Sequence, residues 1–202
     1  MERSITIVSG LPRSGTSMIM RMLQAGGMEI LADNIRKADE DNPDGYYEFE
    51  KVKKIEEDSS WLGDAEDKAF KMVSMLLRHL PVDRNYKIIF MKRIIDEILA
   101  SQRRMLGNLG REDGSVSDEE MGKLFNKHLA EIERWLEKQP NMDVQYMSYN
   151  DILEKPLENI QALNCFLDKR LDVNKMVKLV DKSLYRQRMK NVGPICATGT
   201  NH

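Results

Sequence analysis

Two glycines, Gly10 and Gly15, stand five positions apart in the segment Gly-Leu-Pro-Arg-Ser-Gly-Thr-Ser at 10–17. An apolar run at 5–8 predicts a strand before them, and apolar residues at helical spacing from Met18 predict a helix after them. At such a turn, successive backbone N–H groups can curl around an anion at the helix N-terminus. The segment therefore predicts a phosphate-binding loop, since a turn without a ligand would need only one glycine.

The residue after Gly15 indicates which kind of phosphate the loop could bind. Loops for ATP or GTP carry a lysine there, which reaches the β- and γ-phosphates, whereas this chain has Thr16. Arg13 supplies a positive charge inside the loop instead, and the hydroxyls of Thr16 and Ser17 can donate to phosphate oxygens. We therefore expect the loop to hold a single phosphate rather than a triphosphate.

A second group of residues that could bind an anion follows a strand predicted at 86–91. This nearly continuous apolar run is typical of a strand buried on both faces of a parallel sheet. Arg93 comes just after it, and Ser101 lies eight positions further on, within a helix predicted at 95–106. Ligands of α/β sheets bind at the carboxyl ends of strands, so Arg93 and Ser101 should face the same crevice as the glycine loop.

The Pro-Arg-Ser-Gly-Thr string at 12–16 resembles the loop with which sulfotransferases bind the 5′-phosphosulfate of 3′-phosphoadenosine 5′-phosphosulfate (PAPS). The Arg-x7-Ser spacing resembles the pair that binds the 3′-phosphate in that family. Segments 41–48 and 149–156 resemble those of bacterial sulfotransferase-like proteins. The resemblance implies PAPS as donor, adenosine 3′,5′-bisphosphate (PAP) as product and no metal. It assigns the nucleotide to Pro12, Arg13, Ser14, Gly15, Thr16, Ser17, Arg93, Ser101, Arg186 and Arg188.

The resemblance is incomplete at the catalytic residues. Lys71 matches the lysine of the family's Lys-x-His segment, where it would assist the bridging oxygen, but Val73 stands in the histidine position. Other branches use a carboxylate as base, and we expect Glu48 first and Asp33 second, because both lie between the first helix and the second strand. The alternative is that these two carboxylates only cap or solvate that segment. The implied catalytic set is Arg13, Lys71, Glu48 and Asp33.

The favoured function is transfer of a sulfuryl group from PAPS to a hydroxyl or amine of a small-molecule or carbohydrate acceptor. One alternative is a P-loop kinase acting on a nucleotide or small molecule. Thr16 in place of lysine disfavours it, as does the lack of a clear Mg²⁺-binding aspartate after a strand. The other is a catalytically inactive domain that binds PAP or another nucleotide, suggested by the missing histidine.

The amino-acid composition argues against some classes of protein and some locations. The 202 residues carry a formal net charge of −2, which argues against a nucleic-acid-binding protein. The two cysteines show no metal-binding spacing, and no secretory leader is recognisable, so a cytoplasmic location is expected. No apolar run approaches the roughly 18 residues needed to span a membrane.

Strands alternate with helices along the chain. Strands are predicted at 5–8, 68–73, 86–91 and 144–149, and helices from 18, at 75–80, at 95–106, at 117–138 and from 156. Ser117 and Glu120 should form a capping box, and His128 lies in an apolar stripe, where a packed structural role is expected. The order predicts one α/β domain at 1–190, a mainly parallel sheet flanked by helices, followed by a flexible tail at 191–202. The resemblance implies a P-loop nucleotide-hydrolase-like sulfotransferase architecture.

Overall fold

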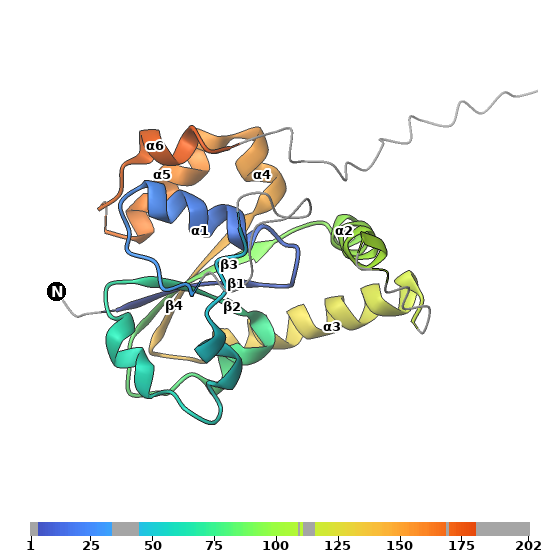
Figure 1. Cartoon of the computed structure of the whole chain (residues 1–202), viewed down its shortest axis with the longest axis horizontal. Helices are drawn as coiled ribbons and strands as arrows, with labels where there is room; N and C mark the ends of the chain where they lie inside the picture. Colours follow the sequence, from blue (N-terminus) through green and yellow to red (C-terminus); the bar gives the residue numbers. More distant parts are fainter. Residues whose placement is uncertain (1–3, 34–44, 109, 111–115, 169, 181–202) are drawn as a thin grey trace, which may run out of the picture.

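A four-stranded sheet forms the centre of the protein (Figure 1). The computed structural model describes residues 4–33, 45–108, 110, 116–168 and 170–180. The strand order is β2-β1-β3-β4, and every pairing is parallel. The predicted α/β class is therefore confirmed. The strands are β1 (Ile5–Gly10), β2 (Ala69–Val73), β3 (Tyr86–Lys92) and β4 (Met142–Ser148).

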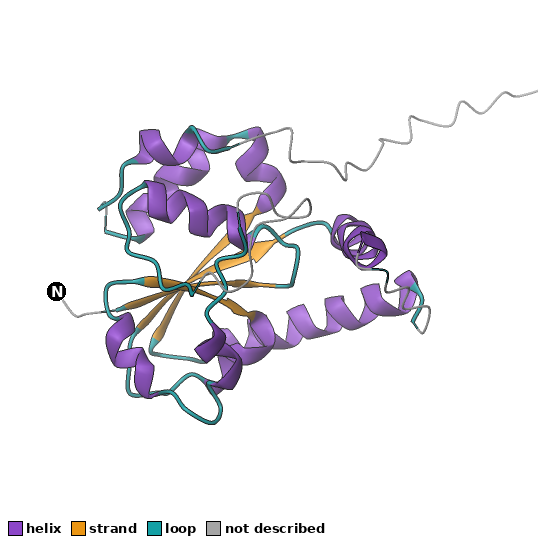
Figure 2. Ribbon diagram, viewed as in Figure 1, coloured by secondary structure: helices purple, strands orange, loops and turns teal. Residues whose placement is uncertain are grey.

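Helices cover both faces of the sheet (Figure 2). One face carries α1 (Thr16–Ala25), α4 (Tyr149–Glu154), α5 (Pro156–Phe166) and α6 (Val173–Val177). The other carries α3 (Asp118–Leu136) and three 3₁₀ helices, η1 (Glu50–Lys54), η2 (Ser60–Ala65) and η3 (Ser74–His79). The remaining helix, α2 (Ile95–Asn108), lies beyond the carboxyl ends of the strands and packs on α3 (Figure 1).

The apolar run of β3 explains why the core has two halves. Ile88 and Phe90 pack into the cluster under α3, whereas Ile89 and Met91 pack into the cluster under α1. All four side chains are almost fully buried. A central parallel strand covered by helices on both sides requires this continuous apolar sequence, and it holds the carboxyl end of β3 rigidly.

The end of β4 differs from the prediction. The strand runs from Met142 to Ser148, so the predicted strand at 144–149 begins too late and is wrong at its last residue, because Tyr149 opens α4. The Ser148 hydroxyl accepts a hydrogen bond of 3.2 Å from the backbone N–H of Asp151, as an N-cap does. The alternation of apolar and polar residues continues through Tyr149, which concealed the start of the helix.

The capping box on α3 is confirmed. The Ser117 hydroxyl accepts from the backbone N–H of Glu120, whose carboxylate accepts from the backbone N–H of Ser117. Further along this helix, His128 Nε2 lies 2.8 Å from the Ser74 hydroxyl at the start of η3. The histidine is half-buried and joins α3 to the end of β2. This arrangement agrees with the packed structural role expected of it.

Several predictions fall on residues outside the described ranges. They include residues 41–44 of the family-like segment at 41–48, the basic residues Arg186 and Arg188, and the tail at 191–202. The domain limits therefore stay a prediction. None of the helices in the described part of the chain is both long and apolar enough to cross a membrane.

The environment of His128 predicts a pH-dependent stability. Burial, and then the positive charge of Arg78, lower the pKa of His128 in the folded protein, against a smaller opposing effect of Glu131. The unfolded chain therefore binds this proton more readily, so the contribution is complete above about pH 6.5 and is lost as the pH falls. Between pH 7.5 and 5.5, the free energy of unfolding should decrease more steeply in the native protein than in His128→Gln. Denaturant titrations at several pH values measure both slopes, and parallel curves would contradict the prediction.

Candidate anion-binding site at the carboxyl edge of the sheet

The glycine loop joins β1 to the N-terminus of α1. Gly15 is the N-cap residue, has φ 101° and offers no side chain to cap the helix. The first backbone N–H groups of a helix have no partner within the helix, and they carry the positive end of its dipole. The first turn of α1 contains no acidic side chain that could oppose an anion there. The start of α1 can therefore receive an anion, and the phosphate-binding role of the loop stays a prediction.

Close neighbouring atoms leave no room for a side chain at Gly10 or at Gly15. A Cβ atom on Gly15 would lie 2.5 Å from the ring of Tyr149. A Cβ on Gly10 would lie 2.6 Å from the carbonyl oxygen of Met91 and 2.7 Å from the Ser14 hydroxyl. Each has a positive φ that side chains rarely adopt. The loop is thus packed tightly between β3 and the first turn of α4.

Two buried hydroxyls in this region favour a bound ligand. The side-chain oxygens of Ser9, at the end of β1, and Ser14, in the loop, are buried and have no hydrogen-bond partner among the described residues. A buried hydroxyl without a partner costs about 1–3 kcal/mol. An anion in the loop would offer acceptor oxygens near the Ser14 hydroxyl, which belongs to the loop itself. The loop therefore fits an anion better than it fits a purely structural turn.

Arg93 follows β3 and contacts three groups in the described part of the chain. Its Nη1 donates to the carbonyl oxygen of Arg13 at 3.2 Å, and its Nε donates to the Glu97 carboxylate at 3.0 Å. The guanidinium carbon also lies 4.2 Å from the centre of the Tyr149 ring, within the range of a cation–π interaction. The side chain is only 8% exposed. Arg93 is therefore a fixed cation beside the loop.

The loop and the Arg93–Ser101 pair form one continuous site. Arg13 has φ 69°, and its Nε donates to the Ser101 hydroxyl at 2.9 Å. A hydroxyl that accepts one hydrogen bond can still donate its own proton. The side chains of Arg93 and Ser101 thus lie against the glycine loop, as the position of both after β3 predicted.

Lys71 extends this site toward β2. Its Nζ donates to the carbonyl oxygen of Tyr46, and it lies 3.4 Å from the Ser17 hydroxyl in the first turn of α1. That hydroxyl also donates to the Tyr46 carbonyl at 3.4 Å. The structure therefore brings a third predicted cationic residue, after Arg13 and Arg93, to the start of the helix that follows the loop.

Glu48 and Asp33, the predicted bases, lie on segments that meet before η1. The backbone N–H of Asp33 donates to the carbonyl oxygen of Glu48. The Asp33 carboxylate accepts a hydrogen bond of 2.6 Å from the backbone N–H of Glu50, where η1 begins. This is the capping role considered for it as an alternative. The Glu48 carboxylate lies 3.6 Å from Lys53 Nζ and is 24% exposed. Their catalytic role stays a prediction, and Glu48 is the better candidate of the two.

The sequence reasoning missed Glu97 and Asn150. Glu97 is buried, and the side-chain amide of Asn150 donates to both of its carboxylate oxygens at 3.3 Å. Asn150 had been noticed only as part of a family-like segment. The opposite charges of Arg93 and Glu97, four residues apart, were a usable signal, although Arg93 itself precedes α2.

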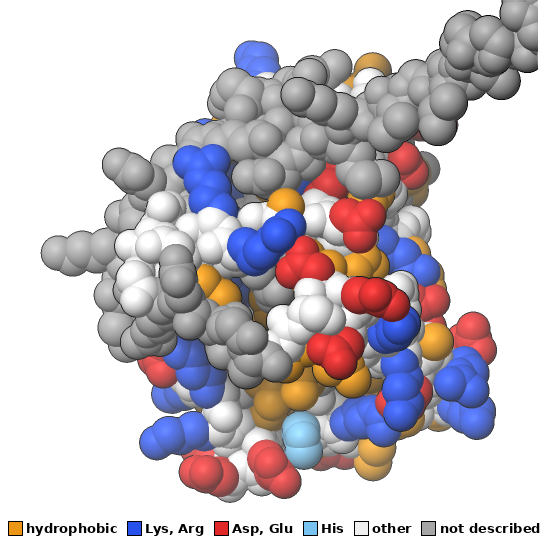
Figure 3. Space-filling view, turned by 90° about the vertical axis from the view of Figure 1, so that its right-hand side faces the viewer, with side chains coloured by type: hydrophobic (Ala, Val, Ile, Leu, Met, Phe, Trp, Pro, Cys, Tyr) orange, Lys and Arg blue, Asp and Glu red, His pale blue; other side chains and the backbone are white. Residues whose placement is uncertain are grey.

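Charges of both signs lie on the face at the carboxyl ends of the strands. Figure 3 shows basic, acidic and hydrophobic side chains interspersed there. Selection of an anion at this edge must therefore come from particular contacts rather than from a strongly basic surface. Among the described residues, no group of three or more His, Cys, Asp or Glu is placed to hold a metal ion.

A model of the sulfotransferase domain family matches residues 3–195. The chain belongs to the sulfotransferase family. No curated protein matches the sequence. The match covers both candidate anion-binding groups, from Gly10 to Ser101, together with Lys71. The family thus agrees with the resemblance seen in the loop and in the Arg-x7-Ser spacing.

Several solved structures are similar to this sulfotransferase domain, and the first of them shares its fold. Mouse sulfotransferase SULT7A1 complexed with PAP is 18% identical, with a TM-score of 0.56, over 89% of this chain. Retinol dehydratase in complex with androsterone and the inactive cofactor PAP is 16% identical over 87% of this chain, with a TM-score of 0.49. The chain spans 63% and 62% of the lengths of these two proteins. A sulfotransferase domain from the curacin biosynthetic pathway is 15% identical, with a TM-score of 0.47, over 82% of this chain and 74% of its own.

Two glycine-to-alanine variants test the close packing of the loop. Gly15 and Gly27 both have φ 101°, so alanine strains the backbone similarly at each, by about 1–2 kcal/mol. At Gly27 the added Cβ meets no described atom within 4 Å, whereas at Gly15 it meets Tyr149. We expect Gly15→Ala to lower the free energy of unfolding by about 1–3 kcal/mol more than Gly27→Ala does, because the ring must move. Equal losses in denaturant titrations would show that Tyr149 does not press on the loop.

Proposed function

We propose that this sulfotransferase domain moves a sulfuryl group from PAPS to a hydroxyl or amine of a small-molecule or carbohydrate acceptor. The observation that carries the proposal is the direct contact of Arg13 with both Arg93 and Ser101. It joins the glycine loop to the second anion-binding pair, so a nucleotide with charged groups at both ends could engage both. The PAP bound to mouse SULT7A1, a sulfotransferase of the same fold, supports this choice.

The two ends of the nucleotide would be held by different residues. The backbone N–H groups of the loop, with Thr16 and Ser17, would hold the 5′-phosphosulfate at the helix N-terminus. Arg93 and Ser101 would hold the 3′-phosphate through charge-assisted hydrogen bonds. Arg186 and Arg188, outside the described residues, are proposed to add basic groups. PAPS itself supplies the sulfuryl group that is transferred.

The reaction requires alignment and charge neutralisation more than covalent chemistry from the protein. A bond forms between the acceptor oxygen or nitrogen and sulfur, while the bond from sulfur to the bridging oxygen breaks and its electron pair leaves with PAP. Arg13 and Lys71 would neutralise the negative charge that develops on the departing phosphate. The proton of the acceptor would go to a carboxylate, for which we propose Glu48 first and Asp33 second.

Replacement of Arg13 should strongly reduce turnover. Loss of one donor that stabilises the transition state lowers turnover by on the order of 100-fold, and this is the effect expected of Arg13→Ala. Release of PAP from PAPS, measured across a panel of hydroxyl- and amine-bearing acceptors, gives the rate. Arg103→Ala is the matched control, because Arg103 is 67% exposed and pairs with Asp118. Unchanged turnover in Arg13→Ala would remove this role, and PAP binding without turnover on any acceptor would favour an inactive nucleotide-binding domain.

Replacement of Ser101 should weaken the binding of PAP specifically. We expect Ser101→Ala to reduce PAP affinity by roughly 1–3 kcal/mol, through the loss of a hydrogen bond to the 3′-phosphate. Adenosine 5′-phosphate, which lacks that group, should bind as it does to the native protein. Ser117→Ala is the control, because it removes a helix cap at a cost of about 1 kcal/mol of stability but should leave PAP affinity unchanged. Calorimetric titration measures both ligands, and equal PAP affinity in Ser101→Ala would count against the assignment.

A further inference from the structure

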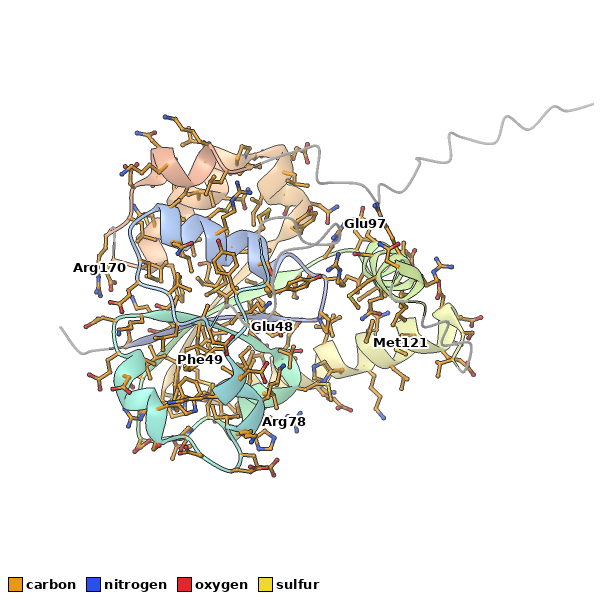
Figure 4. All side chains as sticks on the ribbon, in the orientation of Figure 1. Glu48, Phe49, Arg78, Glu97, Met121 and Arg170 are labelled. Carbon is orange, nitrogen blue, oxygen red and sulfur yellow. The ribbon has the colours of Figure 1, made fainter. Side chains whose placement is uncertain are left out.

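Glu97 is a buried acidic residue in the first turn of α2 (Figure 4). Glu97 as a whole is only 2% exposed, and its side chain is 1% exposed. Carboxylates are almost never buried so completely unless they are paired, because removal from water disfavours their charged form. A specific set of contacts must therefore hold this group in place.

The contacts that Glu97 makes with described residues come from two separate segments. Oε2 accepts from Nε of Arg93 at 3.0 Å, and both carboxylate oxygens lie 3.3 Å from the amide nitrogen of Asn150. Arg93 follows β3, whereas Asn150 lies in the first turn of α4. The carboxylate thus ties α2 to the ends of two neighbouring strands.

Stabilisation of the helix alone does not account for this burial. An acidic side chain near a helix N-terminus interacts favourably with the helix dipole even when it is exposed. Asp96 occupies the same first turn and is exposed to solvent. A role at the helix end therefore needs only Asp96, whereas Glu97 is turned toward Arg93.

The effect of Glu97 on Arg93 is to fix the plane of the guanidinium. The Nε edge of the Arg93 guanidinium donates to the Glu97 carboxylate, and Nη1 donates to the carbonyl oxygen of Arg13. The face of the guanidinium lies against the ring of Tyr149. Arginine has a long and flexible side chain, so ordering it in advance lowers the entropic cost of binding an anion.

We propose that Glu97 is a positioning residue that orients Arg93 toward the 3′-phosphate of the nucleotide. This inference rests on the proposed function, since it presumes a ligand with that phosphate. Glu97 acts only through Arg93. Its effect should therefore depend on the presence of the 3′-phosphate and not on the rest of the nucleotide.

Glu97→Gln tests this role with little change in shape. Glutamine has one acceptor oxygen where glutamate has two, and it lacks the charge that strengthens the hydrogen bond to Arg93. We expect calorimetric titration to give about tenfold weaker PAP binding in this variant, with adenosine 5′-phosphate binding within about twofold of the native protein. Asp96→Asn, which removes the neighbouring exposed carboxylate, should leave both affinities unchanged.

A double variant separates positioning from other roles. In an Arg93→Ala background, addition of Glu97→Gln should not change the ratio of PAP to adenosine 5′-phosphate affinity, because the residue that Glu97 orients is gone. A further decrease in this ratio would overturn the proposal, since Glu97 would then act on the 3′-phosphate by another route. Equal weakening of both ligands by Glu97→Gln alone would also overturn it and indicate a purely structural residue.

Failure of this inference can be distinguished from failure of the proposed function. If the native protein prefers PAP over adenosine 5′-phosphate and Glu97→Gln keeps that preference, only the role of Glu97 is overturned. If the native protein binds the two ligands equally, the 3′-phosphate site is overturned and the role of Glu97 with it.

Asn150→Ala provides a second route to the same answer if Glu97→Gln does not fold. It removes the amide that contacts both carboxylate oxygens but leaves the ion pair with Arg93. We expect about threefold weaker PAP binding and unchanged binding of adenosine 5′-phosphate. Unchanged PAP affinity in a folded Asn150→Ala protein would overturn the proposal.

Discussion

The fixed position of Arg93 is the constraint on which the rest of the site depends. Parallel strands end at one edge, and here their register matches: Gly10 pairs with Met91 in β1 and β3, and Lys92 pairs with Ser148 in β3 and β4. The residues that follow β3 and β4 are therefore at the same level. This places the guanidinium of Arg93 beside the ring of Tyr149, with the glycine loop on the other side. The site is thus a direct result of sheet register, and the apolar core of β3 holds that register in place.

Tyr149 contacts both candidate anion-binding groups, the glycine loop and Arg93. One side of its ring would collide with a Cβ on Gly15, and the guanidinium of Arg93 lies against the same ring. A displacement of the loop would therefore reach Arg93 through a rigid aromatic side chain. Interiors packed this closely transmit strain rather than absorbing it. The arrangement keeps the spacing between the two groups nearly constant, which a ligand with charges at both ends requires.

The sequence predicted the parts of the site that depend on short-range spacing. The loop, Arg93 and Ser101 were found because each lies at a fixed distance from a strand end, and the parallel sheet followed from the alternation of strands with helices. Glu97 and Asn150 were missed because their contact joins α2 to α4, and only the folded chain brings these helices together. Tyr149 was misplaced in a strand because Ser148, its helix cap, looks like any polar residue in an alternating pattern. The choice of Glu48 as catalytic base stays a prediction, because Glu48 lies in a segment without a strong pattern.

The junction between β4 and α4 has no connecting residues, because Ser148 ends the strand and Tyr149 begins the helix. Successive residues of an α-helix are separated by about 100° around its axis. One inserted or deleted residue at this junction would rotate Tyr149 and Asn150 together by that angle and break the contacts of both at once. Related chains should therefore tolerate insertions and deletions in surface loops. They should not tolerate them between Ser148, the last paired residue of β4, and Tyr149.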